Sequence, residues 1–336
     1  MSPSARARVA LIGLGPIGVE VGKALAGRPS IAFLGAADPA PDKAGRPLAE
    51  LLGASFSGVA RPTAAALYGE TASARGRTDV VLLCTGSRLH VILPQIEEAI
   101  AAGFHVVSTC EELAYPELRH LPMARKIDRL AVEKGVAVLG TGVNPGLVMD
   151  RLVLAVASAC VRVDSVRVTR VVDAAKRRGP LRAKVGAGLT PREFAAGVDA
   201  KRLGHVGLSE SAAIIALGLG LRIDEITETI EPVLAERETD GVAAGSVLGL
   251  HQVALVQAGD EIKVALDLTM AVGASSPADR IDVEGDPPVH VTVAGGFHGD
   301  RSTVGTVVNA VPFIVSAPPG LKNVVTLPLF GLQPLS

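Results

Sequence analysis

Aromatic residues are scarce in this chain: they form 3% of its 336 residues, with no Trp and only two Tyr, Tyr68 and Tyr115. A surface on which nucleobases stack is therefore not expected, and any apolar pocket must be built mainly from aliphatic side chains. An excess of one charge is also lacking, because 33 Lys and Arg balance 34 Asp and Glu, for a formal net charge of −1. This balance gives no support to a nucleic-acid partner or to binding at an acidic membrane surface.

Cysteine is equally scarce, since Cys84, Cys110 and Cys160 are widely spaced, odd in number and form no C-x-x-C pair. This argues against a disulfide framework and favours a reducing compartment. The first residues contain no apolar run long enough for a signal or membrane segment, so we expect a cytoplasmic protein. The seven His show no metal-ligand spacing and no G-x-S-x-G is present, so neither a metal site nor a serine nucleophile is expected.

The length is sufficient for two domains, and 48% hydrophobic with 20% charged residues indicates a soluble globular protein with a large core. In residues 1–150, short apolar strands alternate with helical segments, which predicts a Rossmann domain: a doubly wound parallel sheet of the α/β class. In residues 151–308, longer alternating strands predict an α+β domain with an open, largely antiparallel sheet, which we expect to bind substrate and to dimerise. Residues 309–336 are expected to return to the first domain.

The segment from Gly13 to Gly18 reads G-x-G-x-x-G between a predicted strand and a predicted helix. In such a turn the first glycine permits a tight bend, the second lets the backbone approach a pyrophosphate, and the third lets the helix pack on the strand. The free N–H groups of the helix N-terminus then meet the phosphates. We therefore predict dinucleotide binding by Gly13, Gly15, Pro16, Ile17 and Gly18.

Asp38 ends the next predicted strand, about 20 residues past the glycines, where an acid holds the adenosine ribose in dinucleotide folds. A carboxylate there would repel a 2′-phosphate, which favours NAD(H), with NADP(H) as the alternative. The competing interpretation is that Asp38 merely opens the turn at Pro39.

Ligands of parallel sheets bind outside the carboxyl ends of the strands. The stretches 13–18, 85–87, 108–112 and 141–146 all follow predicted strands, so we expect them to meet at one edge. The further cofactor contacts predicted there are Thr85, Gly86, Ser87, Thr109 and Asn144, with Asn309 reaching the nicotinamide if the last helix folds back.

Glu111 and Glu112 follow a predicted strand directly. Adjacent carboxylates repel, so one is expected to keep a raised pKa, which suits a general acid or base near neutral pH. The alternative is that they cap the next helix or form salt bridges. Cys110 beside them is either a nucleophile or, as is commoner, a small packing residue.

The remaining candidates are assigned to a substrate pocket. His205 lies between glycines in a predicted loop and is either a pocket residue or a core histidine. Arg170, Lys176, Arg177 and Arg178 are candidates to bind a substrate carboxylate, although the basic run is also typical of a solvated turn. The predicted pocket residues are Cys110, Glu112, Thr141, Gly142, Pro145, Leu147, Val148, Arg170 and His205.

Together these stretches resemble the 2,4-diaminopentanoate dehydrogenases and the native amine dehydrogenases. The specific motifs are Glu-Glu-x-Ala-Tyr-Pro at 111–116 and Gly-Thr-Gly-x-Asn-Pro-Gly at 140–146. Further matches are Asp150, 204–207 with Glu210 and Ser211, and 309–312 with 319–321. The nucleotide domain is similar to that of the dihydrodipicolinate reductases, although the His-rich catalytic motif of those enzymes is absent from this sequence.

The resemblance implies NAD(P)H-dependent reductive amination of a small ketone by ammonia, and the reverse oxidative deamination. It also implies that Glu111 is the catalytic carboxylate, with Glu112 in support. Two alternatives remain open: another NAD(P)-dependent reductase, of the dihydrodipicolinate reductase or homoserine dehydrogenase type, and a non-catalytic nucleotide-binding protein.

Overall fold

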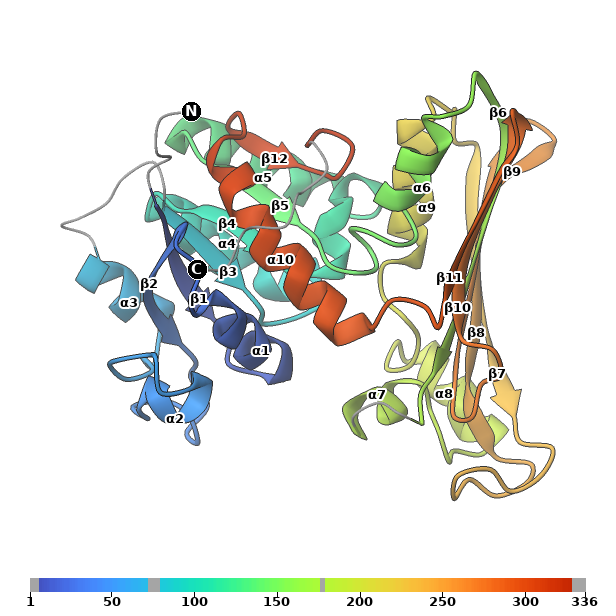
Figure 1. The fold of residues 1–336 in the computed structure, drawn as a ribbon, viewed down its shortest axis with the longest axis horizontal. Coiled ribbons are helices and arrows are strands. Elements are labelled where there is room, and N and C mark those ends of the chain that lie inside the picture. The colour runs from blue at the N-terminus through green and yellow to red at the C-terminus, as the bar shows by residue number, and fades with distance from the viewer. Residues whose placement is uncertain (1–5, 72–78, 176–178, 328–336) are drawn as a thin grey trace. The chain divides into compact units, whose positions relative to one another are not determined.

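A computed structural model describes residues 6–71, 79–175 and 179–327. The chain forms two compact units (Figure 1). Unit 1 comprises Met1–Leu147 with Gly299–Ser336, and unit 2 comprises Val148–His298. The chain thus returns to unit 1 at Gly299, earlier than the return at residue 309 that we expected. Among the described helices, none has the length and apolar character needed to cross a membrane.

The described part of unit 1 holds a six-stranded parallel sheet in the order β12-β5-β4-β3-β1-β2. Its strands are β1 (Ala7–Ile12), β2 (Ile31–Ala37), β3 (Asp79–Leu83), β4 (His105–Ser108), β5 (Ala137–Gly140) and β12 (Gly320–Lys322). The connecting α-helices are α1 (Pro16–Leu25), α2 (Leu48–Leu52), α3 (Ala64–Thr71), α4 (Leu89–Ala101), α5 (Leu121–Lys134) and α10 (Gly299–Val315). Two short 3-10 turns, η2 (Glu111–Ala114) and η3 (Pro116–Leu118), follow β4.

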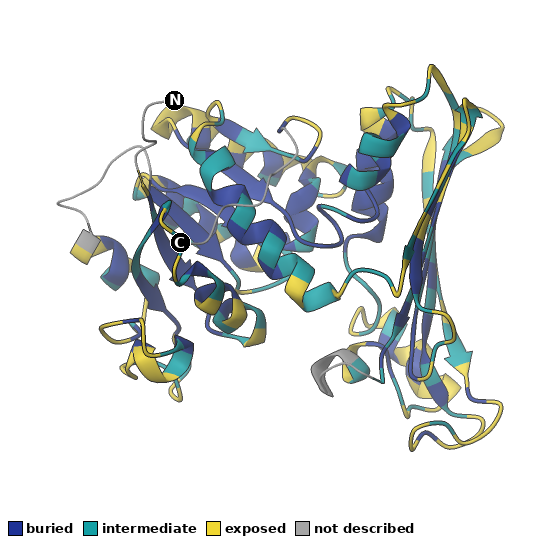
Figure 2. Cartoon of the chain, in the orientation of Figure 1, coloured by how far each residue is buried: buried dark blue, intermediate teal, exposed yellow. Residues whose placement is uncertain are grey.

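Helices cover both faces of this sheet, which is why its strands are apolar runs with no polar face. Alternate residues of β1 show the division: Val9 and Leu11 belong to the core shared with α1 and α10, whereas Ala10 and Ile12 belong to the core shared with α4 and α5. Every residue of β3, β4 and β5 is buried, as Figure 2 shows. The predicted doubly wound sheet is confirmed.

Unit 2 contains a second six-stranded sheet, in the order β11-β10-β6-β9-β8-β7. All its pairs are antiparallel except β6 with β9, so the predicted largely antiparallel sheet is confirmed. The strands are β6 (Arg162–Asp173), β7 (Glu225–Leu234), β8 (Val247–Ala258), β9 (Glu261–Ala271), β10 (Ala278–Asp286) and β11 (Val289–Ala294). The helices are α6 (Arg151–Ala157), α7 (Gly179–Lys184), α8 (Pro191–Asp199) and α9 (Leu208–Gly218).

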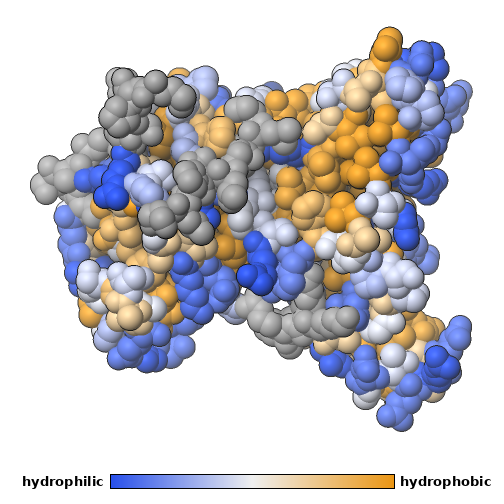
Figure 3. Space-filling view, in the orientation of Figure 1, coloured by the Kyte–Doolittle hydropathy of each residue, from blue (hydrophilic) through white to orange (hydrophobic). Residues whose placement is uncertain are grey.

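One face of this sheet is covered by α9, whose residues are buried from Leu208 to Ala216. Apolar residues reach the surface near α6 and α9, where Val161 is 90% and Leu217 42% exposed, and this region is orange in Figure 3. Helix α8 begins with reciprocal hydrogen bonds: Thr190 accepts one from the Glu193 N–H at 3.2 Å, and Glu193 accepts one from the Thr190 N–H at 2.9 Å. This is a capping box, with Pro191 at the first helical position.

Strand β10 carries few of the apolar residues whose alternation predicts a strand with one apolar face. Its sequence, ADRIDVEGD, is rich in charge, and an acid on the inner face of a sheet is atypical. The structure shows the compensation: Asp279 lies beside Arg170 of β6, and both are almost fully buried as an ion pair.

Candidate active site

The loops that follow β1, β3, β4 and β5 lie next to one another at the carboxyl edge of the parallel sheet. Backbone hydrogen bonds join the first residue of each loop to the end of a neighbouring strand. They run from Gly13 N–H to Ala37 O (2.9 Å), Cys84 N–H to Ile12 O (2.8 Å), Thr109 N–H to Leu83 O (3.1 Å) and Thr141 N–H to Ser108 O (2.9 Å). The four stretches singled out in the sequence are therefore neighbours.

The glycine turn after β1 has the geometry expected for a dinucleotide. Gly13 has φ +91°, and a Cβ there would stand 2.6 Å from the Cys84 carbonyl oxygen. A Cβ on Gly18 would stand 1.8 Å from the Gly13 oxygen, so α1 packs against the turn as closely as glycine allows. At Gly15, by contrast, a Cβ would meet no described heavy atom within 4 Å. Gly15 and Pro16 begin α1 without a side-chain cap, which leaves its first N–H groups available to a phosphate.

Asp38 holds the glycine turn against the end of β2. One carboxylate oxygen accepts a hydrogen bond from the Leu14 N–H at 2.6 Å, and the other accepts one from the Ala40 N–H at 2.9 Å. The second bond forms the turn at Pro39, which was the alternative to ribose binding. Asp38 is thus placed beside the glycine turn and also shapes its own loop, so the two interpretations are compatible.

The β3–α4 loop contains Thr85, Gly86 and Ser87. Thr85 is exposed and donates to the Gln95 side chain at 2.6 Å, while Gly86 and Ser87 are half-buried. The neighbouring Thr109 is half-buried, and Ser108 donates to the Leu83 oxygen at 3.0 Å. These bonds hold the loops at the edge in fixed positions relative to β3 and β4.

The two adjacent glutamates have different environments. Glu111 opens η2 and is half-buried. Glu112 is buried, and its carboxylate binds Arg88 Nη1 at 2.8 Å, the Leu89 N–H at 2.7 Å and His120 Nε2 at 3.1 Å. Burial alone would raise the pKa of Glu112, but the hydrogen bonds from Arg88 and Leu89 and the charge of His120 together lower it below its usual value. The salt-bridge alternative therefore describes Glu112, whose pKa is lowered rather than raised.

The structure distinguishes between the two interpretations of Cys110. The residue is 0% exposed and packs in the core shared by α4 and α5. Burial also raises the pKa of the thiol well above its ordinary value. Since the thiolate is the nucleophilic form, Cys110 is a packing residue rather than a nucleophile.

The β5 loop is closely packed. Thr141 is 2% exposed, and its hydroxyl has no hydrogen-bond partner among the described residues. A Cβ on Gly146, which has φ +127°, would stand 2.5 Å from that hydroxyl, so only glycine fits there. Gly142, Asn144 and Pro145 are buried as well. The Val143 N–H donates to the Thr303 hydroxyl at 3.2 Å, which brings α10 to this edge.

Thr303 lies at this edge but was not among the predicted residues, because nothing in the sequence distinguishes its hydroxyl from others in the predicted last helix. Asn309, which we did expect at the nicotinamide, lies two turns further along α10. Its side-chain oxygen accepts a hydrogen bond from Arg28 at 3.3 Å. Arg28 follows the C-terminal end of α1, and the glycine turn lies about 15 Å away at the other end. This hydrogen bond of Asn309 joins α10 to the segment that follows α1.

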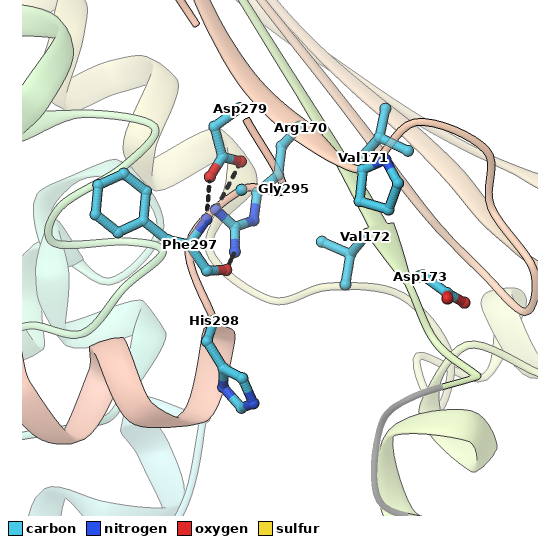
Figure 4. A pocket seen from close by; sticks show the side chains of 10 residues that line it. Arg170, Val171, Val172, Asp173, Asp279, Gly295, Phe297 and His298 are labelled. Carbon is cyan, nitrogen blue, oxygen red and sulfur yellow. Dashed lines mark hydrogen bonds and ion pairs between the residues drawn. The ribbon is translucent and has the colours of Figure 1, made fainter. Parts of the chain in front are cut away.

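In unit 2, Arg170 joins β6 to β10 and to the segment that follows β11 (Figure 4). Its guanidinium donates to Asp279 at 2.8 Å and to the Phe297 carbonyl at 2.9 Å, while Asp279 accepts from the Phe297 N–H at 2.7 Å. The cavity beside it is about 370 Å³ and is otherwise lined largely by Val, Pro, Gly and Phe residues. Because Asp279 neutralises Arg170, this residue gives little support to the expected substrate carboxylate. Lys176, Arg177 and Arg178 lie outside the described residues.

The loop around His205 is fixed by Gln252, which accepts from the His205 N–H and donates to the His205 carbonyl, both at 2.8 Å. The imidazole Nε2 is shielded from solvent and has no hydrogen-bond partner among the described residues. Burial, followed by the charges of Lys184 and Arg170, lowers the pKa of His205 to about 3. The ring is therefore neutral at any ordinary working pH. Of the other pocket candidates, Leu147 is half-buried at the end of unit 1, and Val148 is fully buried at the start of unit 2.

The glycine turn yields a paired test. Gly18→Ala is expected to lower the free energy of unfolding by about 3 kcal/mol or more, because the methyl group collides with the Gly13 carbonyl. Gly15→Ala should change it by less than about 0.5 kcal/mol, because its methyl group meets open space. If that space receives a pyrophosphate, Gly15→Ala weakens NADH binding in a fluorescence titration. Unchanged NADH binding in that variant would contradict the assignment of the turn.

His205 yields a pH prediction. Its pKa in the folded chain lies below the value of about 6.5 in an unfolded chain, so the unfolded chain binds the extra proton more readily. Stability from this group is complete above pH 6.5 and is lost as the pH falls towards 3. The unfolding midpoint of His205→Asn should thus depend less steeply on pH between 6.5 and 4 than that of the parent, with exposed His90→Asn as the control. Equal slopes in all three proteins would refute the burial of a neutral imidazole.

The known proteins that this chain resembles in sequence include a 2,4-diaminopentanoate dehydrogenase and an amine dehydrogenase. The family model for the 2,4-diaminopentanoate dehydrogenase C-terminal domain matches residues 147–332. A 2,4-diaminopentanoate dehydrogenase from Acetoanaerobium sticklandii is 34% identical over 262 residues, which cover 75% of this chain and 74% of the relative. An amine dehydrogenase from Streptomyces virginiae is 24% identical over 284 residues, covering 76% of this chain and 79% of that protein.

Among solved structures, the amine dehydrogenase from Mycobacterium smegmatis matches with a TM-score of 0.84 and 22% identity, over 98% of both chains. At that identity the likeness shows that the fold is shared. The family assignment depends instead on the sequence matches, which extend over both units. The chain belongs to the 2,4-diaminopentanoate dehydrogenase family of oxidoreductases.

Proposed function

We propose that this protein is an NAD(P)H-dependent amine dehydrogenase that reductively aminates a ketone with ammonia and catalyses the reverse oxidative deamination. The observation that carries the proposal is the placement of Glu111. This half-buried carboxylate opens the turn after β4, at the same sheet edge as the glycine turn. The names of the relatives, an amine dehydrogenase and a 2,4-diaminopentanoate dehydrogenase, support the same chemistry.

The glycine turn supports a dinucleotide cofactor, because open space at Gly15 adjoins the uncapped start of α1. Gly13, Pro16, Ile17, Gly18 and Asp38 would hold its pyrophosphate and ribose, while the loops at Thr85 and Thr109 would border it. Asp38 favours NAD(H) over NADP(H), since its carboxylate would repel a 2′-phosphate. When bound, the reduced nicotinamide supplies the hydride that the substrate carbon receives.

In the proposed mechanism, ammonia adds to the ketone carbonyl and gives a carbinolamine. Glu111 donates a proton to the departing hydroxyl, so that water leaves and a protonated imine forms. The resulting carboxylate of Glu111 then stabilises the positive charge on that imine. In the reverse direction the same carboxylate removes a proton as water adds. Glu112 takes no part in these transfers, because its oxygens already bind Arg88, Leu89 and His120.

Three finer expectations extend the proposal. Unit 1 is proposed to bind the dinucleotide, and unit 2 to bind substrate and to dimerise, because its open sheet has edge strands, β7 and β11, available for pairing. The three cysteines are free, which supports a reducing compartment such as the cytoplasm. The substrate is a small ketone or amine. Arg170 gives little support to a carboxylate on that substrate, because Asp279 already neutralises its charge.

The first test is the ammonia dependence of NADH oxidation over a panel of simple and carboxylate-bearing ketones, run with NADPH in parallel. The proposal expects oxidation only when ketone and ammonia are both present, and faster with NADH than with NADPH. Oxidation with ketone alone would instead support a carbonyl reductase. NADH binding with no turnover on any ketone or amine would support a non-catalytic protein.

The second test is Glu111→Gln, which keeps the size of the side chain but removes the titrating group. We expect kcat to fall by about 1,000-fold, within the range for losing a positioned acid or base, while the dissociation constant for NADH stays unchanged. Near-normal kcat in this variant would overturn the assignment of Glu111.

A further inference from the structure

The carboxylate of Glu112 joins three separate segments of unit 1. One oxygen accepts from Arg88 Nη1 at 2.8 Å, at the end of the β3–α4 loop. The other accepts from the Leu89 N–H at 2.7 Å, at the start of α4, and contacts His120 Nε2 at 3.1 Å, just before α5. The Glu112 side chain is only 5% exposed, so these bonds replace the water that an ionised carboxylate otherwise requires.

The turn that carries Glu111 is held from its other side by β5. A Cβ on Gly140 would stand 2.4 Å from the carbonyl carbon of Leu113, so the backbone of η2 lies directly against the end of that strand. The Leu113 N–H also donates to the Cys110 oxygen at 3.1 Å. Held between β5 and the bonds of Glu112, the turn has little freedom to move by itself.

Substituting only one member of the Glu112–Arg88 ion pair is also expected to lower the stability of this region. Removing Arg88 leaves a buried carboxylate with one donor fewer, and removing the charge of Glu112 leaves the Leu89 N–H beside a weaker acceptor. The loop and the turn are therefore stable together and should loosen together.

We propose that Glu112 is a positioning residue that, with Arg88, holds the β3–α4 loop and the Glu111 turn as one rigid body. The loop spans Thr85 to Arg88, whose first residues are proposed to border the cofactor, and the turn carries the proposed proton shuttle. The second glutamate of the pair thus sets the distance between nicotinamide and Glu111. This inference is built on the role proposed for Glu111.

The experiment compares Glu112→Gln with Glu117→Gln, a matched change at an exposed position in the next 3-10 turn. Arg88→Gln is the second variant: its side chain is 37% exposed, so the chain should fold even if Glu112→Gln does not. Arg88→Lys keeps the charge and should restore part of the effect. Three quantities are measured: hydrogen exchange of the amides from residue 85 to 90 without cofactor, the dissociation constant for NADH, and kcat.

For Glu112→Gln and Arg88→Gln we expect amide exchange about tenfold faster, NADH binding about tenfold weaker and kcat about 100-fold lower, since small displacements in an active site have effects of that size. The double variant should be no worse than about the poorer single one, because both changes break the same pair. Glu117→Gln should match the parent, and Glu111→Gln should lose kcat alone.

The positioning role is overturned if Glu112→Gln and Arg88→Gln match Glu117→Gln in amide exchange and in NADH binding, or if their losses add in the double variant. These two readouts do not require turnover. They decide the role of Glu112 even if the parent protein shows no ammonia-dependent reaction, which would overturn the proposed function by itself.

Discussion

The parallel pairing of β1, β3, β4 and β5 is the constraint on which the candidate site depends. Parallel strands present all their carboxyl ends at one edge of the sheet. Here the ends of β1, β2, β3 and β4 each accept a backbone hydrogen bond from the first residue of the loop that follows a neighbouring strand. Segments more than 100 residues apart in the sequence, such as those at Gly13 and Thr141, thereby come to lie along the same edge of the sheet. The edge is also rigid, because the strands are buried on both faces.

Within this edge, electrostatics separates two side chains that look equivalent in the sequence. Glu112 has hydrogen bonds to both oxygens and a pKa held below its usual value, so it remains a carboxylate and a structural anchor. Glu111 begins the same turn and is half-buried. A proton shuttle must exchange its proton during each cycle, which is incompatible with the fixed charge of Glu112. Glu112 therefore holds the turn in place through its hydrogen bonds, and Glu111 is the candidate for catalysis.

The features that the sequence predicted well are local. The glycine turn is set by residues within a few positions of one another: Gly13 has the positive φ of a tight bend, and Gly18 leaves no room for a Cβ. Other contacts could not be predicted from the sequence, because they join residues that are distant from one another along the chain. Asn309 binds Arg28 because of how α10 crosses α1, and Arg170 pairs with Asp279 on β10, a strand that is hard to predict because its sequence is rich in charge. Cys110 is buried by helices that only the tertiary fold brings to it.

The most direct measurement is an isotope experiment with the whole chain, a simple ketone, nitrogen-15 ammonia and NADH carrying deuterium at the transferred position. Mass spectrometry of the product then reports which bonds formed. The account predicts an amine that contains nitrogen-15 and one deuterium on the former carbonyl carbon. A deuterated alcohol without nitrogen-15 would contradict it, because the hydride would then have been delivered to the ketone rather than to an imine.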